Sequence, residues 1–172
     1  MKKPEADFYH SHVKPAFDAL SGSFVHSRHE DRVTPGTPDI DYACEGGGWI
    51  ELKRIKAPRR ENGRAPIRHL TKQQVGFLRL RGFHGQGAWV LVMVDEGWVE
   101  TQTWARPGHK VFYLWGHWQL EKLEAPGIRY VLWKDEAVAY WEGRIDPYEL
   151  RQVVAGHTRG NRVPHIVRKA SR

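Results

Sequence analysis

Cysteine is almost absent from this sequence, and so are long apolar runs. A single cysteine, Cys44, excludes an internal disulfide and a cysteine-based structural zinc site, so Cys44 is expected to be a small core residue. No run of about 18 apolar residues is present, and the first residues, MKKPEADF, contain no apolar segment of the kind found in signal peptides. The sequence therefore predicts a soluble cytoplasmic protein, in a bacterium or a phage-infected cell, with no membrane partner.

Acidic residues are fewer than basic ones. Asp and Glu number 20 against 27 Lys and Arg, which gives a net charge of +7 with neutral histidines. Nucleic acid is the commonest polyanion that such a protein meets in a cytoplasm. With 172 residues, 40% of them hydrophobic, the chain is long enough and apolar enough to fold as one domain. Ten histidines are present, but the two densest groups, at 10–12 and 26–31, lack the spacing of a helical zinc pair.

The first 95 residues show a clear order of elements. Their order of helix, strand, β-hairpin, helix and strand (α-β-β-β-α-β) predicts an α/β fold with a mixed sheet flanked by helices. Residues 4–20 predict a helix or helix pair, interrupted near Pro15, with Phe8, Val13, Phe17 and Leu20 buried. The other expected elements are a strand within 21–28, hairpin strands at 38–44 and 49–55, a helix capped by Thr71 with Gln74 in a capping box, a buried strand at 88–95 and its antiparallel partner at 97–104.

The second half of the chain is harder to interpret. Residues 104–145 are rich in tryptophan, and each apolar run there is compatible with either a strand or a helix. This region is an elaboration of the sheet, a dimer surface or a DNA-stacking platform, although most of the eight tryptophans are expected to be core. Asp146 and Pro147 predict the start of a last helix. We expect one domain over 1–155, with a core at 5–101 and an elaboration at 104–155, and a basic tail at 156–172.

The predicted hairpin, PDIDYACEGGGWIELKR, has an unusual polar face. With the turn centred on the glycines at 46–48, Asp39 lies opposite Lys53 and Asp41 lies opposite Glu51. Since side chains alternate between faces, these four charged residues share one face and the apolar residues share the other. Carboxylates held by rigid strands suit a hard divalent cation, whose usual partner is a phosphate group. The alternative is a solvated face with a weak cross-strand ion pair.

The charge next to the hairpin favours the first interpretation. From Lys53 to Lys72, eight residues are Lys or Arg and only Glu61 is acidic. A basic loop beside an acidic pocket suits an enzyme that holds a nucleic-acid backbone and cuts it. The candidate DNA-binding residues are Arg54, Lys56, Arg59, Arg60, Arg64, Arg68 and Lys72.

The residues TPD at 37–39 and IELK at 50–53 resemble the motif of the PD-(D/E)xK nuclease superfamily. The longer pattern RVTPGTPDIDY, GGGWIELKR and LTKQQVGFL resembles its VRR-NUC branch, which includes phage-type and Holliday-junction-resolvase-like nucleases. The resemblance covers roughly residues 28–95. It implies a restriction-endonuclease-like core and a Mg²⁺-dependent DNA endonuclease, with Mn²⁺ as a substitute, that leaves a 5′-phosphate and a 3′-hydroxyl on duplex or branched DNA.

The resemblance also assigns roles to residues of this chain. It makes Asp39, Glu51 and the main-chain carbonyl of Leu52 metal ligands, and Lys53 the catalytic lysine. Gln74 becomes the helix glutamine near the scissile phosphate, with Gln73 as its rival. Glu5 becomes a further metal ligand from the first helix, with Asp7 as its rival.

Two questions remain open at this level. A module that binds nucleic acid on a nuclease fold without cutting it is the alternative function, and the intact Asp39, Glu51 and Lys53 count against it. The preferred form of DNA is not determined, nor is the homodimer that symmetric junction cleavage would require.

Overall fold

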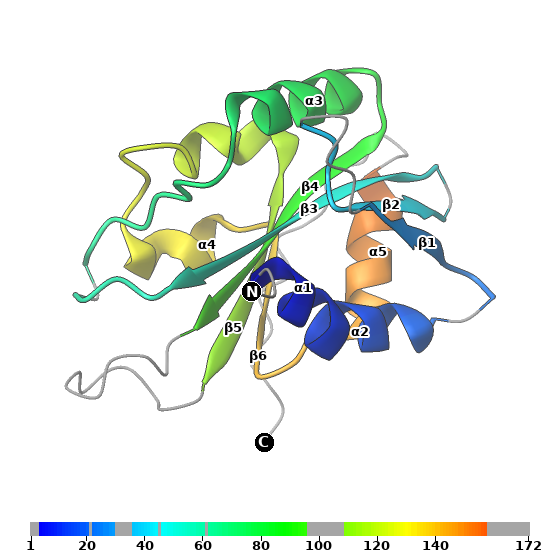
Figure 1. Ribbon diagram of the computed structural model, residues 1–172, viewed down its shortest axis with the longest axis horizontal. Coiled ribbons are helices and arrows are strands. Elements are labelled where there is room, and N and C mark those ends of the chain that lie inside the picture. Colours follow the sequence, from blue (N-terminus) through cyan, green and yellow to red (C-terminus); the bar gives the residue numbers. More distant parts are fainter. Residues whose placement is uncertain are drawn as a thin grey trace.

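The fold is built on one mixed six-stranded sheet with helices on both faces (Figure 1). The computed structural model describes residues 4–20, 22–29, 36–44, 46–60, 62–95 and 109–157. Within these residues the strands follow one another across the sheet in chain order, and only β3 and β4 are parallel. The strands are β1 (Val25–Arg28), β2 (Ile40–Ala43), β3 (Gly48–Lys56), β4 (Gly87–Asp95), β5 (Lys110–Gly116) and β6 (Ala139–Glu142). The predicted α/β class, with a mixed sheet flanked by helices, is confirmed.

One face of the sheet is covered by the first and last helices of the described chain. The first is continuous but changes its winding, from α1 (Pro4–Phe8) through a π-helical segment (Tyr9–Val13) to α2 (Lys14–Asp18), which has Pro15 in its first turn. The four residues predicted to be buried along it are buried. The last is α5 (Pro147–His157), which begins where predicted because the Asp146 carboxylate accepts a hydrogen bond from the N–H of Glu149.

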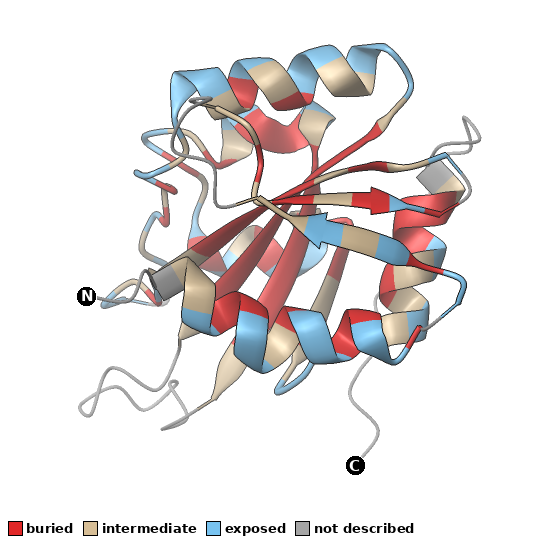
Figure 2. Cartoon of the chain, turned by 45° about the vertical axis from the view of Figure 1, so that its right-hand side comes forward, coloured by how far each residue is buried: buried red, intermediate tan, exposed pale blue. Residues whose placement is uncertain are grey.

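The opposite face carries α3 (Lys72–Phe83) and a set of short helices. These are the 3₁₀ helices His117–Lys122 and Tyr130–Leu132, and α4 (Trp133–Glu136). Every residue of β4 except Asp95 is buried, as expected for a central strand packed on both faces (Figure 2). None of the helices in the described ranges is both long and apolar enough to span a membrane.

The tryptophan-rich half extends the sheet. Its two apolar runs were ambiguous because each contains two kinds of structure: β5 continues into a 3₁₀ helix, and α4 leads into β6. Trp115 and Trp133 are fully buried and Trp141 is nearly so, as predicted for core residues. The segment 97–104, predicted to pair with β4, lies outside the described residues. Both edges of β4 are occupied by β3 and β5, so β5 is the antiparallel neighbour of β4.

The β2–β3 hairpin has a different register from the predicted one. Ile40 pairs with Ile50 and Tyr42 pairs with Gly48, so each residue of β2 lies opposite the β3 residue two positions before the one expected. Gly48 is a strand residue, and a Cβ atom there would lie 2.4 Å from the carbonyl oxygen of Gly87. A shift of two residues leaves every side chain on its predicted face, but Asp41 now pairs with Trp49 and Asp39 comes level with Glu51.

Candidate active site

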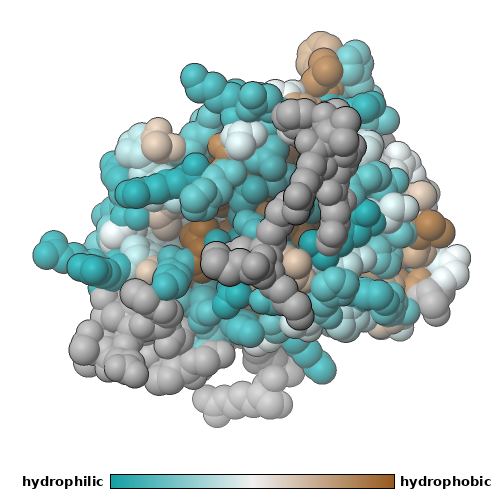
Figure 3. All heavy atoms as spheres, viewed as in Figure 1, coloured by the Kyte–Doolittle hydropathy of each residue, from teal (hydrophilic) through white to brown (hydrophobic). Residues whose placement is uncertain are grey.

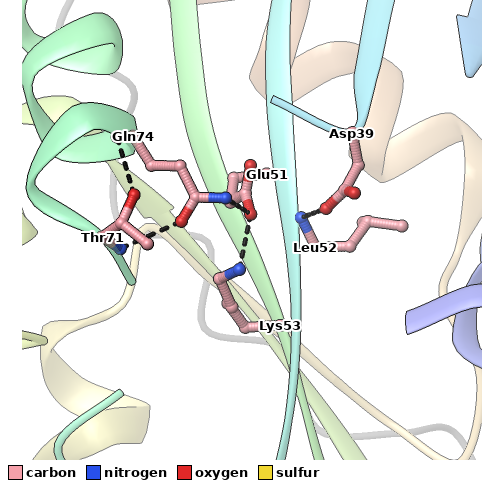
Figure 4. A network of polar contacts seen from close by, with 6 residues as sticks. All are labelled: Asp39, Glu51, Leu52, Lys53, Thr71 and Gln74. Carbon is pink, nitrogen blue, oxygen red and sulfur yellow. Dashed lines mark hydrogen bonds and ion pairs between the residues drawn. The ribbon is translucent and has the colours of Figure 1, made fainter. Parts of the chain in front are cut away.

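Part of the polar face of the hairpin is covered by α3, while Asp41 on the same face is 41% exposed and pairs with His29. The side chains of Glu51 and Lys53 are 1% and 8% exposed. Both extend from β3 toward α3, where Gln74 meets Glu51 (Figure 4). Charged residues are rarely buried to this extent unless they are paired or functional. The interpretation of this face as a weak surface ion pair is therefore excluded for Glu51 and Lys53.

Glu51 is the centre of the polar network. One of its oxygens, Oε1, accepts hydrogen bonds from the Lys53 Nζ and the Gln74 Nε2, both at 2.5 Å. The other oxygen, Oε2, is buried and has no hydrogen-bond partner within the described part of the chain. Burial and the nearby charge of Asp39 raise the pKa of Glu51 to about 8, although Lys53 opposes this shift. A buried acceptor oxygen without a donor is able to act as a ligand for a cation.

Gln74 is held in one orientation by the cap of α3. Its Oε1 accepts a hydrogen bond from the main-chain N–H of Thr71 at 3.0 Å, while the Thr71 hydroxyl accepts one from the N–H of Gln74. Because the amide oxygen is used in this capping box, the amide NH₂ group faces Glu51. The structure thus brings Gln74, and not its neighbour Gln73, to the site.

Asp39 lies at the start of β2 and is fixed on two sides. Its main-chain carbonyl accepts the N–H of His29 at 2.7 Å, and its carboxylate accepts the N–H of Leu52 at 2.9 Å. Burial raises the pKa of Asp39, and the hydrogen bond from Leu52 opposes that effect. The N–H and C=O groups of a strand residue point to the same side of the strand. The carbonyl of Leu52 therefore points to the side of β3 on which Asp39 accepts the Leu52 N–H.

Glu5 in α1 is close enough to the site for its charge to act on it. The negative charge of Glu5 raises the pKa of Asp39 and also that of Glu51, whereas Asp7 is exposed. The positive charge of Arg28 in β1 acts on Asp39 in the opposite direction. The structure thus favours Glu5 over Asp7 as the third carboxylate, and it adds Arg28, which sequence reasoning missed because Arg28 reaches Asp39 through the pairing of β1 with β2.

The candidate metal ligands do not form a closed cluster. No three His, Cys, Asp or Glu side chains in the described ranges are grouped closely enough to make a metal site by themselves. The donors available are instead two carboxylates on β2 and β3 and a main-chain carbonyl, with Glu5 nearby. Oxygen donors of this kind are those that Mg²⁺ and Mn²⁺ prefer.

The predicted DNA-binding residues fall into two groups. Arg54 is paired with Asp95, and Arg64 donates a hydrogen bond to the carbonyl of Gly127, so these two have structural partners. Arg64 is nevertheless exposed, as are the other five: Lys56, Arg59, Arg60, Arg68 and Lys72. The loop between β3 and α3 is irregular, as expected, but main-chain hydrogen bonds tie it to Leu123, Ile128 and Tyr130. The described surface on the face seen in Figure 3 is mainly hydrophilic, with hydrophobic residues in small separate patches.

Gly36 connects the Asp39 loop to α3. It has a positive φ of 95°, and a Cβ atom there would lie 2.7 Å from the Cβ of Gln73. Gly36→Ala is therefore expected to lower the free energy of unfolding by about 2–4 kcal/mol, from backbone strain and the steric clash, and to slow any reaction that uses Asp39. Denaturant unfolding and activity measurements check both effects.

A matched control separates the two causes. Gly85 has a similar φ of 77°, but no atom lies within 4 Å of a Cβ placed there. Gly85→Ala should cost only the strain of about 1–2 kcal/mol. Equal losses in the two variants would show that contact with Gln73 does not position the Asp39 loop.

Sequence reasoning also missed two residues on the elements that carry Glu51 and Gln74. Trp49 precedes Glu51 by two residues on β3, and Arg81 follows Gln74 by seven residues on α3, so each shares a face with a site residue. That periodicity was a usable signal for both.

The chain matches no protein-family model, and no curated protein is significantly similar to it. The nuclease interpretation therefore depends on the residues and their geometry.

Proposed function

We propose that the protein is a metal-dependent DNA endonuclease that hydrolyses phosphodiester bonds, on a restriction-endonuclease-like core. The observation that carries this proposal is the buried Glu51 carboxylate, which has one oxygen bound to Lys53 and Gln74 and the other without a donor. A structural ion pair would satisfy both oxygens. The open oxygen and the neighbouring Asp39 instead fit a divalent cation, Mg²⁺ or Mn²⁺.

Each residue of the site has a role in this proposal. Asp39, Glu51 and the carbonyl of Leu52 would hold the cation, with Glu5 as a further carboxylate. A bound divalent cation neutralises charge on the scissile phosphate and activates it as a Lewis acid. The Lys53 ammonium is held at the site by Glu51, from where it can orient a water molecule and stabilise negative charge that develops on the phosphate. Gln74 fixes the carboxylate of Glu51.

The charge of the surroundings supports a DNA substrate. Exposed cations surround the link between the two elements: Lys56 ends β3, Arg59, Arg60 and Arg68 lie in the loop that follows, and Lys72 begins the helix that carries Gln74. Lys and Arg side chains at such positions contact phosphates regardless of base sequence. They hold the backbone, and the specificity for one form of DNA must come from elsewhere.

The test is a cleavage assay on labelled four-way junction, flap, linear duplex and single-stranded DNA, with Mg²⁺, Mn²⁺ or EDTA. Lys53→Met keeps the apolar stem of the side chain but removes the ammonium group, and Lys134→Met, at an exposed ion pair on α4, is the control. We expect cutting that requires the metal and Lys53 but not Lys134. Cutting in EDTA, or by the Lys53 variant at the normal rate, would overturn the proposal. Salt-sensitive binding without cutting would favour the non-cleaving module instead.

A further inference from the structure

A strip of aromatic and cationic side chains lies next to the candidate active site. We call the four residues His29, Trp49, Phe77 and Arg81 the stacking strip. The Trp49 ring lies between the others, with its centroid 5.6 Å from that of His29 and 5.1 Å from that of Phe77. The Arg81 guanidinium lies 5.0 Å from the centre of the Phe77 ring and 5.7 Å from that of Trp49. This arrangement brings together the residue that follows β1, strand β3 and helix α3.

The strip continues the row of residues that form the site. On β3, Trp49 and Glu51 point to the same face and are about 7 Å apart along the strand. On α3, Phe77 follows Gln74 by three residues and Arg81 follows by seven, so all three share one side of the helix. The contact of Gln74 with Glu51 and that of Phe77 with Trp49 are therefore neighbouring contacts between the same two elements. About 7 Å corresponds to roughly two nucleotide steps of stacked DNA.

The strip differs from the aromatic core. Its four side chains are all partly exposed, whereas the core tryptophans Trp89, Trp115 and Trp133 are fully buried. Its polar members are also held in place: the His29 Nε2 lies 2.9 Å from a carboxylate oxygen of Asp41, and Arg81 donates a hydrogen bond to Gln86. Fixed aromatic and cationic groups at a surface present flat faces without the entropy cost of ordering them on binding.

We propose that the stacking strip binds an unpaired nucleobase of the DNA strand that is cut, close to the phosphate held at Glu51 and Lys53. This inference rests on the proposed nuclease function and names its substrate class, which is DNA with single-stranded nucleotides beside the scissile bond. Every base has a π face that can stack on Trp, Phe or Arg. A base inside a duplex is already stacked on its neighbours, so it must first be extruded to reach such a surface.

The test measures binding separately from cutting. Single-stranded oligonucleotides with 2-aminopurine at successive positions, and the matching duplexes, are titrated with protein in EDTA. Phe77→Leu keeps an apolar side chain but removes the π face, and Phe83→Ala is the control on the same helix, because Phe83 is 84% exposed. We expect about a tenfold loss of affinity for single-stranded DNA in Phe77→Leu and a similar loss in Trp49→Leu, with little change for duplex. Trp49→Phe and Phe83→Ala should retain the affinity.

The outcomes distinguish the two proposals. An equal loss on single-stranded and duplex DNA, no loss at all, or no single-strand binding by the unaltered protein would overturn the strip proposal. Unaltered protein that cuts DNA, combined with a Phe77→Leu variant of unchanged preference for unpaired substrates, would overturn the strip alone. Strip-dependent binding by a protein that cuts nothing, with Mg²⁺ or Mn²⁺ present, would support the strip as a base-binding surface and overturn the nuclease function.

Discussion

Asp39→Asn is expected to reduce metal-dependent cleavage by about a thousandfold while leaving the fold intact. Asparagine retains an oxygen that can accept the N–H of Leu52, so the local structure at the start of β2 is preserved. The substitution removes the negative charge that makes a carboxylate a strong ligand for a divalent cation. Loss of metal-assisted stabilisation of the phosphate costs several kcal/mol in the transition state, which corresponds to about three orders of magnitude in rate.

Initial rates across a Mg²⁺ titration measure the effect, and thermal unfolding checks the fold. Asp18→Asn is the control, because the carboxylate of Asp18 is exposed and pairs with Lys14 on the same helix. That variant should cleave normally, since exposed ion pairs of this type contribute a few tenths of a kcal/mol. If Asp39→Asn retains more than about a tenth of the activity at saturating Mg²⁺, Asp39 is not a metal ligand.

The faces of the hairpin could be predicted from the sequence, but its register could not. Alternation of polar and apolar residues places Glu51 and Lys53 on one face whatever the exact pairing, provided that any error is an even number of residues. The three adjacent glycines suggested a turn at 46–48. Gly48 is a glycine for another reason: the backbone of Gly87 and the ring of Tyr42 leave no room for a Cβ atom in the strand. That contact joins β3 to β4 and could not be inferred from local sequence.

The burial of Glu51 and Lys53 could likewise not be predicted from local sequence patterns. The capping box at Thr71 predicted the start of α3, and the structure shows that the same hydrogen bonds orient Gln74 toward Glu51. No local pattern indicates that α3 covers β3 at this position, so a solvated face was an alternative. The approach of Arg28 from β1 depends on strand order in the same way, because it follows from the pairing of β1 with β2.

Glu51→Gln is expected to abolish cleavage and, in metal-free protein, to stabilise the fold. The pKa of Glu51 is raised to about 8 in the folded protein from an ordinary value of 4.5. At a pH between these two values, the Glu51 carboxyl is protonated in the folded state and ionised in the unfolded state. This contribution to stability is complete below about pH 4.5 and is lost as the pH rises toward 8 and beyond. Glutamine resembles the protonated carboxyl at every pH, so the variant lacks this pH dependence. At pH 8 its advantage should be on the order of a few kcal/mol.

Denaturant unfolding at pH 5 and pH 8, with EDTA or Mg²⁺, measures the prediction, and Glu124→Gln at an exposed ion pair is the control. Mg²⁺ should stabilise the unaltered protein, because it binds the folded state, and should have little effect on Glu51→Gln. A metal-free variant less stable than the unaltered protein at pH 8 would mean that the contact with Lys53 outweighs the burial of the carboxylate. A Glu51→Gln variant that is more stable but does not cleave DNA would show that the buried charge of Glu51 destabilises the metal-free protein. A bound cation would then compensate for that charge.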